Sequence, residues 1–237
     1  MRLSYDYGQQ RIEFNVIYRR RKTLAIQVKA PSCVTVIAPA GMRKEAILQA
    51  VQGKSKWIVK KLLEIAEMQR RKGTREYVNG ESFLYLGRNY SLQIEHDELA
   101  HVPEVKLLRG KLVVRILTRD EESIKKALQR WYQGKAVEKI WERVNYFQDQ
   151  FDVKPAKVIV KEQQKRWGSC SAKGNLLFNW KTIMAPSSVV DYIVVHEMCH
   201  LVHLNHSKQF WQLVKTILPD YEVRRKALRD NGMMYDL

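Results

Sequence analysis

The chain has 237 residues, with 42 lysines and arginines against 25 acidic residues, so its formal net charge of +17 favours an anionic partner, and its length can bury one large core or two small ones. Three cysteines at unrelated spacings exclude a disulfide framework and a zinc site made of cysteines alone, which favours a reducing compartment. The first residues lack the apolar core of a signal peptide, and no stretch approaches the roughly twenty apolar residues of a membrane span, so we expect a cytoplasmic protein without a membrane partner.

Residues 1–118 are predicted to form a small α+β module. Apolar residues alternate at period two from Leu24 to Val28 and again from Val34 to Val36, on either side of Ala30-Pro31-Ser32, which predicts a β-hairpin. Helical spacing predicts helices over residues 43–72, with a break at Gly53. Further strands are expected near residues 83–85, 90–94 and 112–117.

Residues 119–237 are predicted to form a second domain. Apolar spacing near 3.6 indicates a long amphipathic helix from Glu121 to Phe147. A strand at Val158 and a hairpin joining residues 166–170 to 176–178 follow. Three more helices are expected over residues 187–203, 207–218 and 220–232. The sequence shows no internal repeat.

Residues 196–206 carry the clearest chemical signal, reading His-Glu-Met-Cys-His-Leu-Val-His-Leu-Asn-His. On a helix, His196 and His200 lie one turn apart on a single face, with Glu197 beside them, an arrangement typical of zinc hydrolases. A catalytic zinc ion takes three protein ligands and leaves a fourth position for water. The motif therefore requires a third ligand from elsewhere.

His206 is the best candidate for that third ligand. It follows His196 by ten positions, an offset that suits a chain turning back beneath the metal, and Asn205 tolerates the left-handed conformation that such a turn requires. His203 remains an alternative ligand, a substrate contact or a solvent-facing residue. An ordinary core helix is disfavoured because buried histidine and glutamate are costly without a function.

Basic residues cluster in four places, and aromatic residues such as Tyr18 and Trp57 adjoin some of them. This mixture suits phosphate contact and base stacking, so nucleic acid is a candidate partner. The alternative is a set of solvated helix faces. The clusters are Arg19–Lys22, Lys54–Lys61, Arg70–Lys72 and Arg224–Lys226.

Several motifs between residues 165 and 211 resemble the YgjP-like metallopeptidase family, which is similar to the SprT-like and WLM zinc peptidases. The three-histidine spacing also resembles metzincins, but those carry glycine where this chain has His203, which argues against that assignment. The motifs are Lys165–Cys170, Asn179-Trp180, Asp191-Tyr192, His196–His200, Asn205–Ser207 and Phe210-Trp211.

The resemblance implies an α+β, zincin-like metallopeptidase domain over residues 119–237, in which a small mixed sheet packs on the active-site helix. The β-rich module of residues 1–118 would precede it and recruit substrate or nucleic acid. Zn²⁺ would be held by the positions corresponding to His196, His200 and His206. The SprT-like relatives digest proteins crosslinked to DNA, an analogy that agrees with the charge.

These observations predict a zinc-dependent metallopeptidase acting on a protein or peptide substrate. Zinc would lower the pKa of its bound water, and Glu197 would take the proton and deliver it to the leaving amine. A peptide could add as a strand to residues 166–170, with Arg166 and Trp167 as substrate contacts. The alternative for these two residues is structural, with Trp167 packed on the core and Arg166 in a local ion pair.

Tyr192, Tyr221 and Asn179 are candidate donors to the oxyanion of the reaction. Two other functions compete with peptide hydrolysis. One is a nucleic-acid-binding protein with a structural zinc ion and no peptidase activity. The other is a hydrolase of another amide or of a phosphoester, which the lack of an Asp-rich cluster disfavours.

Overall fold

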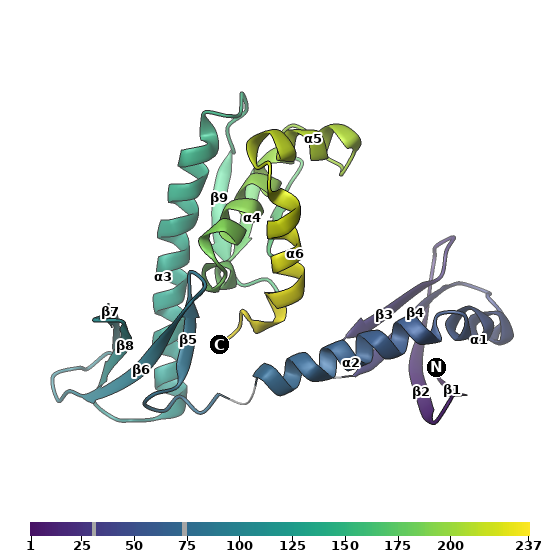
Figure 1. Cartoon of the computed structure of the whole chain (residues 1–237), viewed down its shortest axis with the longest axis horizontal. Helices are drawn as coiled ribbons and strands as arrows, with labels where there is room; N and C mark the ends of the chain where they lie inside the picture. Colours follow the sequence, from purple (N-terminus) through teal and green to yellow (C-terminus); the bar gives the residue numbers. More distant parts are fainter. Residues whose placement is uncertain (30–31, 73–74) are drawn as a thin grey trace. The chain divides into compact units, whose positions relative to one another are not determined.

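The computed structural model describes residues 1–29, 32–72 and 75–237, without the side chains at positions 68, 69, 71 and 72. The chain divides into an N-terminal unit, residues 1–74, and a C-terminal unit, residues 75–237 (Figure 1). Ala30 and Pro31 of the predicted hairpin turn, and the side chains of Arg71 and Lys72 in one basic cluster, lie outside the described residues.

The N-terminal unit is a four-stranded sheet followed by two helices. Its strand order is β1-β2-β4-β3, in which only β2 and β4 pair in parallel. Alternate residues of the strands, such as Phe14 and Val36, pack against Ile47 and Ile58 of the helices. The hairpin β3–β4 and the helix break at Gly53 are confirmed, whereas β1 and β2 were not predicted. The elements are β1 (Arg2–Tyr7), β2 (Gln10–Arg19), β3 (Ala25–Lys29), β4 (Cys33–Pro39), α1 (Lys44–Gln52) and α2 (Ser55–Lys72).

The C-terminal unit begins with a second four-stranded sheet of the same design. Its order is β5-β6-β8-β7, and again only the two central strands pair in parallel. The two sheets therefore repeat one topology, although the sequence shows no internal repeat. The strands are β5 (Ser82–Tyr85), β6 (Arg88–His96), β7 (Glu104–Leu108) and β8 (Lys111–Ile116).

The rest of the C-terminal unit is built around the long helix α3 (Glu121–Gln148), which contacts β9 and α4 (Figure 1). A three-stranded sheet of order β10-β11-β9 has β10 at its edge. No helix in the described ranges has both the length and the apolar character of a membrane span. The elements are β9 (Lys157–Lys161), β10 (Gly168–Cys170), β11 (Asn175–Asn179), the 3₁₀ helix η1 (Trp180–Met184), α4 (Ser187–Cys199), α5 (Lys208–Ile217), α6 (Tyr221–Asn231) and the 3₁₀ helix η2 (Gly232–Met234).

The boundary between the two units lies at residues 74–75, whereas the sequence places it at 118–119. The reason is packing. Phe83 and Leu112 of the second sheet share one core with Ile124 of α3 and Val194 of α4. The strands β5–β8 therefore bury their apolar side chains against the elements that carry the candidate site.

Candidate metal centre

Helix α4 places His196 and Glu197 in the interior of the C-terminal unit. It begins at Ser187 as predicted but ends at Cys199, four residues before the predicted end. The chain turns at His200, whose ring Nδ1 donates to the carbonyl oxygen of His203 at 2.9 Å. The backbone N–H of His203 in turn donates to the carbonyl oxygen of Cys199 at 2.9 Å. This turn leads the chain back to His206.

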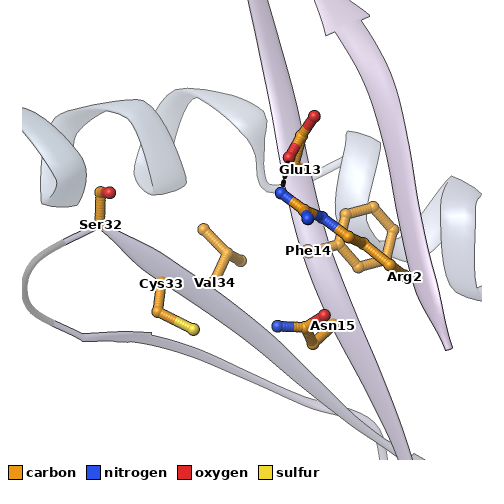
Figure 2. A pocket seen from close by; sticks show the side chains of 7 residues that line it. All are labelled: Arg2, Glu13, Phe14, Asn15, Ser32, Cys33 and Val34. Carbon is orange, nitrogen blue, oxygen red and sulfur yellow. Dashed lines mark hydrogen bonds and ion pairs between the residues drawn. The ribbon is translucent and has the colours of Figure 1, made fainter.

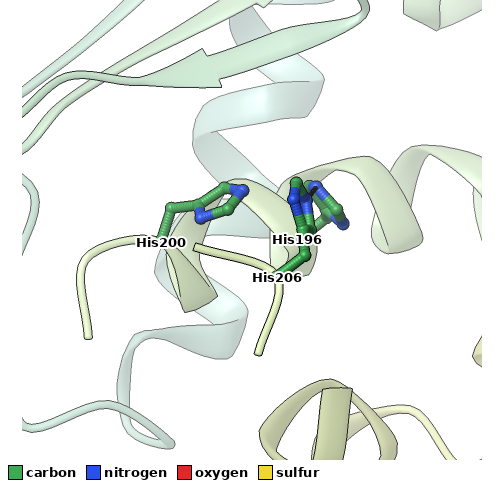
Figure 3. Close-up of side chains that lie close together, drawn as sticks. All are labelled: His196, His200 and His206. Carbon is green, nitrogen blue, oxygen red and sulfur yellow. Dashed lines mark hydrogen bonds between the residues drawn. The ribbon is translucent and has the colours of Figure 1, made fainter. Parts of the chain in front are cut away.

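The three predicted imidazoles converge on one point (Figure 3). One ring nitrogen from each of His196, His200 and His206 lies within 4.8 Å of the others. The Nε2 atoms of His196 and His206 are 3.0 Å apart. Two nitrogens that bind one tetrahedral zinc ion at about 2.0–2.1 Å lie roughly 3.4 Å apart, so this spacing fits a single ion. His203 contributes its carbonyl oxygen to the turn and is not part of this group.

The protonation of these rings also suits a metal ion. The Nδ1 atom of His200 carries a proton because it donates to a carbonyl, which leaves its Nε2 atom free to bind. The Nδ1 atom of His196 is buried without a hydrogen-bond partner in the described part of the chain, and its Nε2 atom faces His206. Burial, reinforced by the neighbouring imidazoles, lowers the pKa of His196 to about 3. Neutral imidazole is the form that binds metals.

The aromatic residues at the start of α5 support the three histidines. The ring of Phe210 is fully buried, and its centroid lies 5.0, 4.6 and 4.7 Å from those of His196, His200 and His206. Trp211 stacks on His206 at 5.5 Å. Sequence reasoning identified Phe210 and Trp211 only through the family resemblance, because aromatic residues at helical spacing are common in cores.

The carboxyl group of Glu197 is buried against strand β10. Its side chain is 6% exposed. A β-carbon at position 168 would lie 2.6 Å from its Cγ atom and 2.7 Å from its Oε1 atom, so any other residue there would displace the glutamate side chain. Burial raises the pKa of Glu197 to about 7, and the guanidinium of Arg166 opposes this shift. The sequence alone did not predict this contact.

The two predicted substrate contacts have different surroundings. Arg166 is exposed and acts electrostatically on Glu197. Trp167 is half-buried and packs edge-on against Tyr235, with ring centroids 5.8 Å apart. A β-carbon at Gly232 would lie 3.2 Å from its ring. The C-terminal segment therefore holds Trp167 in place, as in the structural alternative, while Arg166 stays accessible.

The amide of Asn179 is occupied by structural hydrogen bonds. It donates to the carbonyl oxygens of Gln163 and Arg166 at 2.7 and 3.3 Å, and its oxygen accepts the N–H of Lys181 at 3.1 Å. Asn179 thus stabilises the segment before β10 through two hydrogen bonds, and it caps the N-terminus of η1. Its amide protons are already committed, which removes it as a candidate oxyanion donor.

Two further expectations about the site have different outcomes. Tyr192 is buried with its ring 5.7 Å from that of His196, whereas the hydroxyl of Tyr221 donates to Glu222 at 3.2 Å. The expected left-handed conformation at Asn205 is wrong. Among the described residues, the non-glycine positions with positive φ are Tyr77, Leu86 and Arg109, so the turn is made without one.

Three imidazoles that fit one metal ion, next to a buried carboxyl group, define the site type of a metal-dependent hydrolase. The sequence family described as "YgjP-like, metallopeptidase domain" matches residues 22–231, so the chain belongs to the YgjP-like metallopeptidase family. Membership implies a hydrolase that uses a metal ion. No curated protein matches the chain. The crystal structure of the metallopeptidase zymogen of Pyrococcus abyssi abylysin is similar over 38% of this chain and 89% of that one, with 19% identity and a TM-score of 0.34.

Proposed function

We propose that this protein is a zinc-dependent metallopeptidase whose metal ion is held by His196, His200 and His206. The observation that carries the proposal is the convergence of three ring nitrogens within 4.8 Å of one another. They come from His196 in α4, which also bears Glu197, from His200 at the end of that helix, and from His206 in the segment that follows. A site with only imidazole ligands favours zinc over the oxygen-seeking ions magnesium and calcium. Zinc supplies a Lewis acid that activates water and polarises the scissile carbonyl.

Glu197 is the general base of the proposed reaction. Burial raises its pKa to about 7, close to the value at which a group both accepts and returns a proton at neutral pH. The carboxyl group would take the proton of the attacking water and deliver it to the leaving amine. Because Gly168 has no side chain, the backbone of β10 can lie directly against this carboxyl group.

The substrate is proposed to be a protein segment that pairs with the free edge of β10. An extended peptide there gains main-chain hydrogen bonds without a sequence requirement. Arg166, exposed just before the strand, would contact the substrate next to Glu197. Trp167 would support this strand by packing against Tyr235.

Substitution of Glu197 by glutamine tests the proposal. Glu197→Gln should reduce cleavage of an unfolded protein by about 10²- to 10⁴-fold, the usual contribution of a general base, with bound zinc unchanged. The measurements are proteolysis rates and metal content of the purified protein. Glu138→Gln, at an exposed glutamate of α3, is the control and should keep full activity. Equal cleavage by Glu197→Gln and the unsubstituted enzyme would refute the role of Glu197.

Nucleic-acid-associated proteins are the proposed targets because the excess of positive charge is concentrated in the N-terminal unit. Residues 1–74 hold 16 lysines and arginines against 5 acidic residues, whereas residues 75–237 hold 26 against 20. A basic unit attached to a peptidase would concentrate it on nucleic acid. The proposed location is the cytoplasm, where three free cysteines stay reduced.

The competing function is a nucleic-acid-binding protein whose zinc is structural. It predicts salt-sensitive nucleic-acid binding, unfolding on chelation and no effect of Glu197→Gln on any activity. The experiment above separates the two, since only the peptidase loses a measurable activity when Glu197 is changed.

A further inference from the structure

Two of the hollows on the described part of the N-terminal unit differ in their charge. The first, of about 360 Å³, lies beside the strands β2 and β4 (Figure 2). There the guanidinium of Arg2 forms an ion pair with Glu13, so the cation is already compensated. Its lining residues are Arg2, Glu13, Phe14, Asn15, Ser32, Cys33 and Val34.

The second hollow, of about 440 Å³, is an apolar groove with a cation at its margin. It is lined by Leu24 and Ile26 from the region of β3, by Ala50 of α1, and by Lys54 and Trp57 at the start of α2. Its size is within the range of about 300–1,000 Å³ of small-ligand pockets. Because β3 is an edge strand, the groove opens at the side of the sheet.

Trp57, which lines this groove, is 42% exposed. The indole ring of Trp57 is therefore accessible to a ligand. The aliphatic side chains that line the groove beside it form an apolar surface against which a planar group can pack. Lys54 directly precedes α2 and lines the groove together with Trp57, and Lys60 lies three residues after Trp57, on the same face of the helix. Both lysines are exposed. Lys61 is on the same face and pairs with Glu64 at 2.5 Å.

We infer that this groove binds single-stranded nucleic acid, with one base stacked on Trp57 and the adjacent phosphates held by Lys54 and Lys60. A stacking platform beside cations is the arrangement that binds single strands without sequence preference. A duplex keeps its bases stacked on one another, so it would use the lysines and leave the indole unused. The excess of cations in the unit, 16 against 5 acidic residues, complements a polyanion.

This surface deepens the nucleic-acid part of the proposed function, on which it rests, while binding there requires no peptide hydrolysis. The Glu197→Gln form should therefore bind oligonucleotides as tightly as the unsubstituted chain. Loss of proteolysis and loss of oligonucleotide binding are separate outcomes, so either proposal can fail alone.

The test is fluorescence anisotropy of a labelled oligothymidylate titrated with the full chain. Trp57→Ala should weaken binding by about 5- to 150-fold, the loss expected for one stacked base, and Trp57→Phe should restore much of it. Trp141→Ala is the matched control, because Trp141 lies in α3 and is also 42% exposed. It should bind like the unsubstituted protein.

The lysine contribution is tested by salt dependence. Lys54→Gln should lower the slope of log affinity against log salt by about 0.7, the value for one phosphate contact to a single strand. Lys125→Gln, at an exposed position of α3, should leave the slope unchanged. This measurement stands even if Trp57→Ala impairs folding, which circular dichroism would reveal.

The inference is overturned by an absence of oligothymidylate binding at low salt, by equal binding of the Trp57→Ala and Trp141→Ala forms, or by equal affinity for an abasic phosphodiester chain of the same length. The last two would mean that the surface attracts polyanions in general. Preference for an acidic peptide over oligothymidylate would also reject nucleic acid as the partner.

Discussion

Gly168 determines how closely the edge strand β10 approaches Glu197. Any side chain at this position would overlap the glutamate, since a β-carbon would lie 2.6 Å from its Cγ atom. Pattern reasoning selected Glu197 from its neighbours along the helix, but it could not select Gly168. The contact joins residues from different elements, and glycine in a turn-rich segment has many ordinary explanations.

Substitution of Gly168 by alanine should displace the carboxyl group of Glu197. We expect about 10²-fold lower kcat, because a misplacement of about 1 Å has that effect, with zinc content unchanged. Gly134→Ala, in α3 where a β-carbon meets nothing within 4 Å, is the control and should keep its activity. In a Glu197→Asp background, whose carboxyl group is one methylene shorter, Gly168→Ala should cost much less. Additive losses would show that Gly168 does not act through Glu197.

The histidines of the candidate site differ in how well the sequence alone predicts their roles. His196 and His200 were predictable because helix periodicity alone puts them on one face. His206 required a turn whose hydrogen bonds, from His200 to the carbonyl of His203, are specific to the folded chain. His203 lies within the motif and matters through its backbone, which no side-chain pattern indicates.

The turn between β5 and β6 links the second sheet to the segment that leads into α4, the helix of His196 and Glu197. The backbone N–H groups of Leu86 and Gly87 donate to the carbonyl oxygens of Ile183 and Met184 at 2.8 and 3.2 Å. A β-carbon at Gly87 would lie 2.8 Å from the Cα atom of Pro186. This docking explains why residues 75–118 belong to the same unit as α4.

Gly87→Ala and Gly110→Ala form a matched pair that measures this docking. Both glycines follow a residue with positive φ in a hairpin, and their own φ angles are 75° and 76°. Gly110→Ala should cost about 1 kcal/mol from backbone strain alone, because nothing lies within 4 Å of its β-carbon. Gly87→Ala should cost about 1–3 kcal/mol more through overlap with Pro186. Equal losses in urea denaturation would contradict the proposed coupling.

Element prediction succeeded where one period ran through a long segment and failed at short strands. Helix α3 matches its expected range because apolar spacing persists over its whole length. β7 was missed because it has only five residues, and Leu108 directly after Leu107 interrupts the alternation that begins at Val105. β1 and β2 were missed despite the alternation of Ile12, Phe14 and Val16, which is a clear strand signal.

The whole molecule consists of two units with separate cores. The N-terminal core contains residues such as Phe14 and Ile58, whereas the C-terminal core runs from Tyr77 to Tyr235 and includes α4. Only the second contains the candidate metal ligands. The two units should therefore respond differently to zinc.

Calorimetry of the full chain should show two unfolding transitions, of which zinc shifts only one. Free zinc at 1,000 times its Kd should stabilise the C-terminal unit by about 4.1 kcal/mol, and chelation should remove that gain. The N-terminal transition is the internal control and should stay in place. One joint transition that moves as a whole would mean that the units unfold together.

The candidate site residues could be predicted from local sequence patterns, because helix periodicity and charge are properties of neighbouring residues. His196, Glu197, His200 and the basic residues around Trp57 could be selected in this way. The unit boundary, the approach of Gly168 to Glu197 and the repeated sheet topology came from folding. They depend on contacts between residues far apart in the chain, such as Phe83 with the core of α3 and α4, and no local period encodes such contacts.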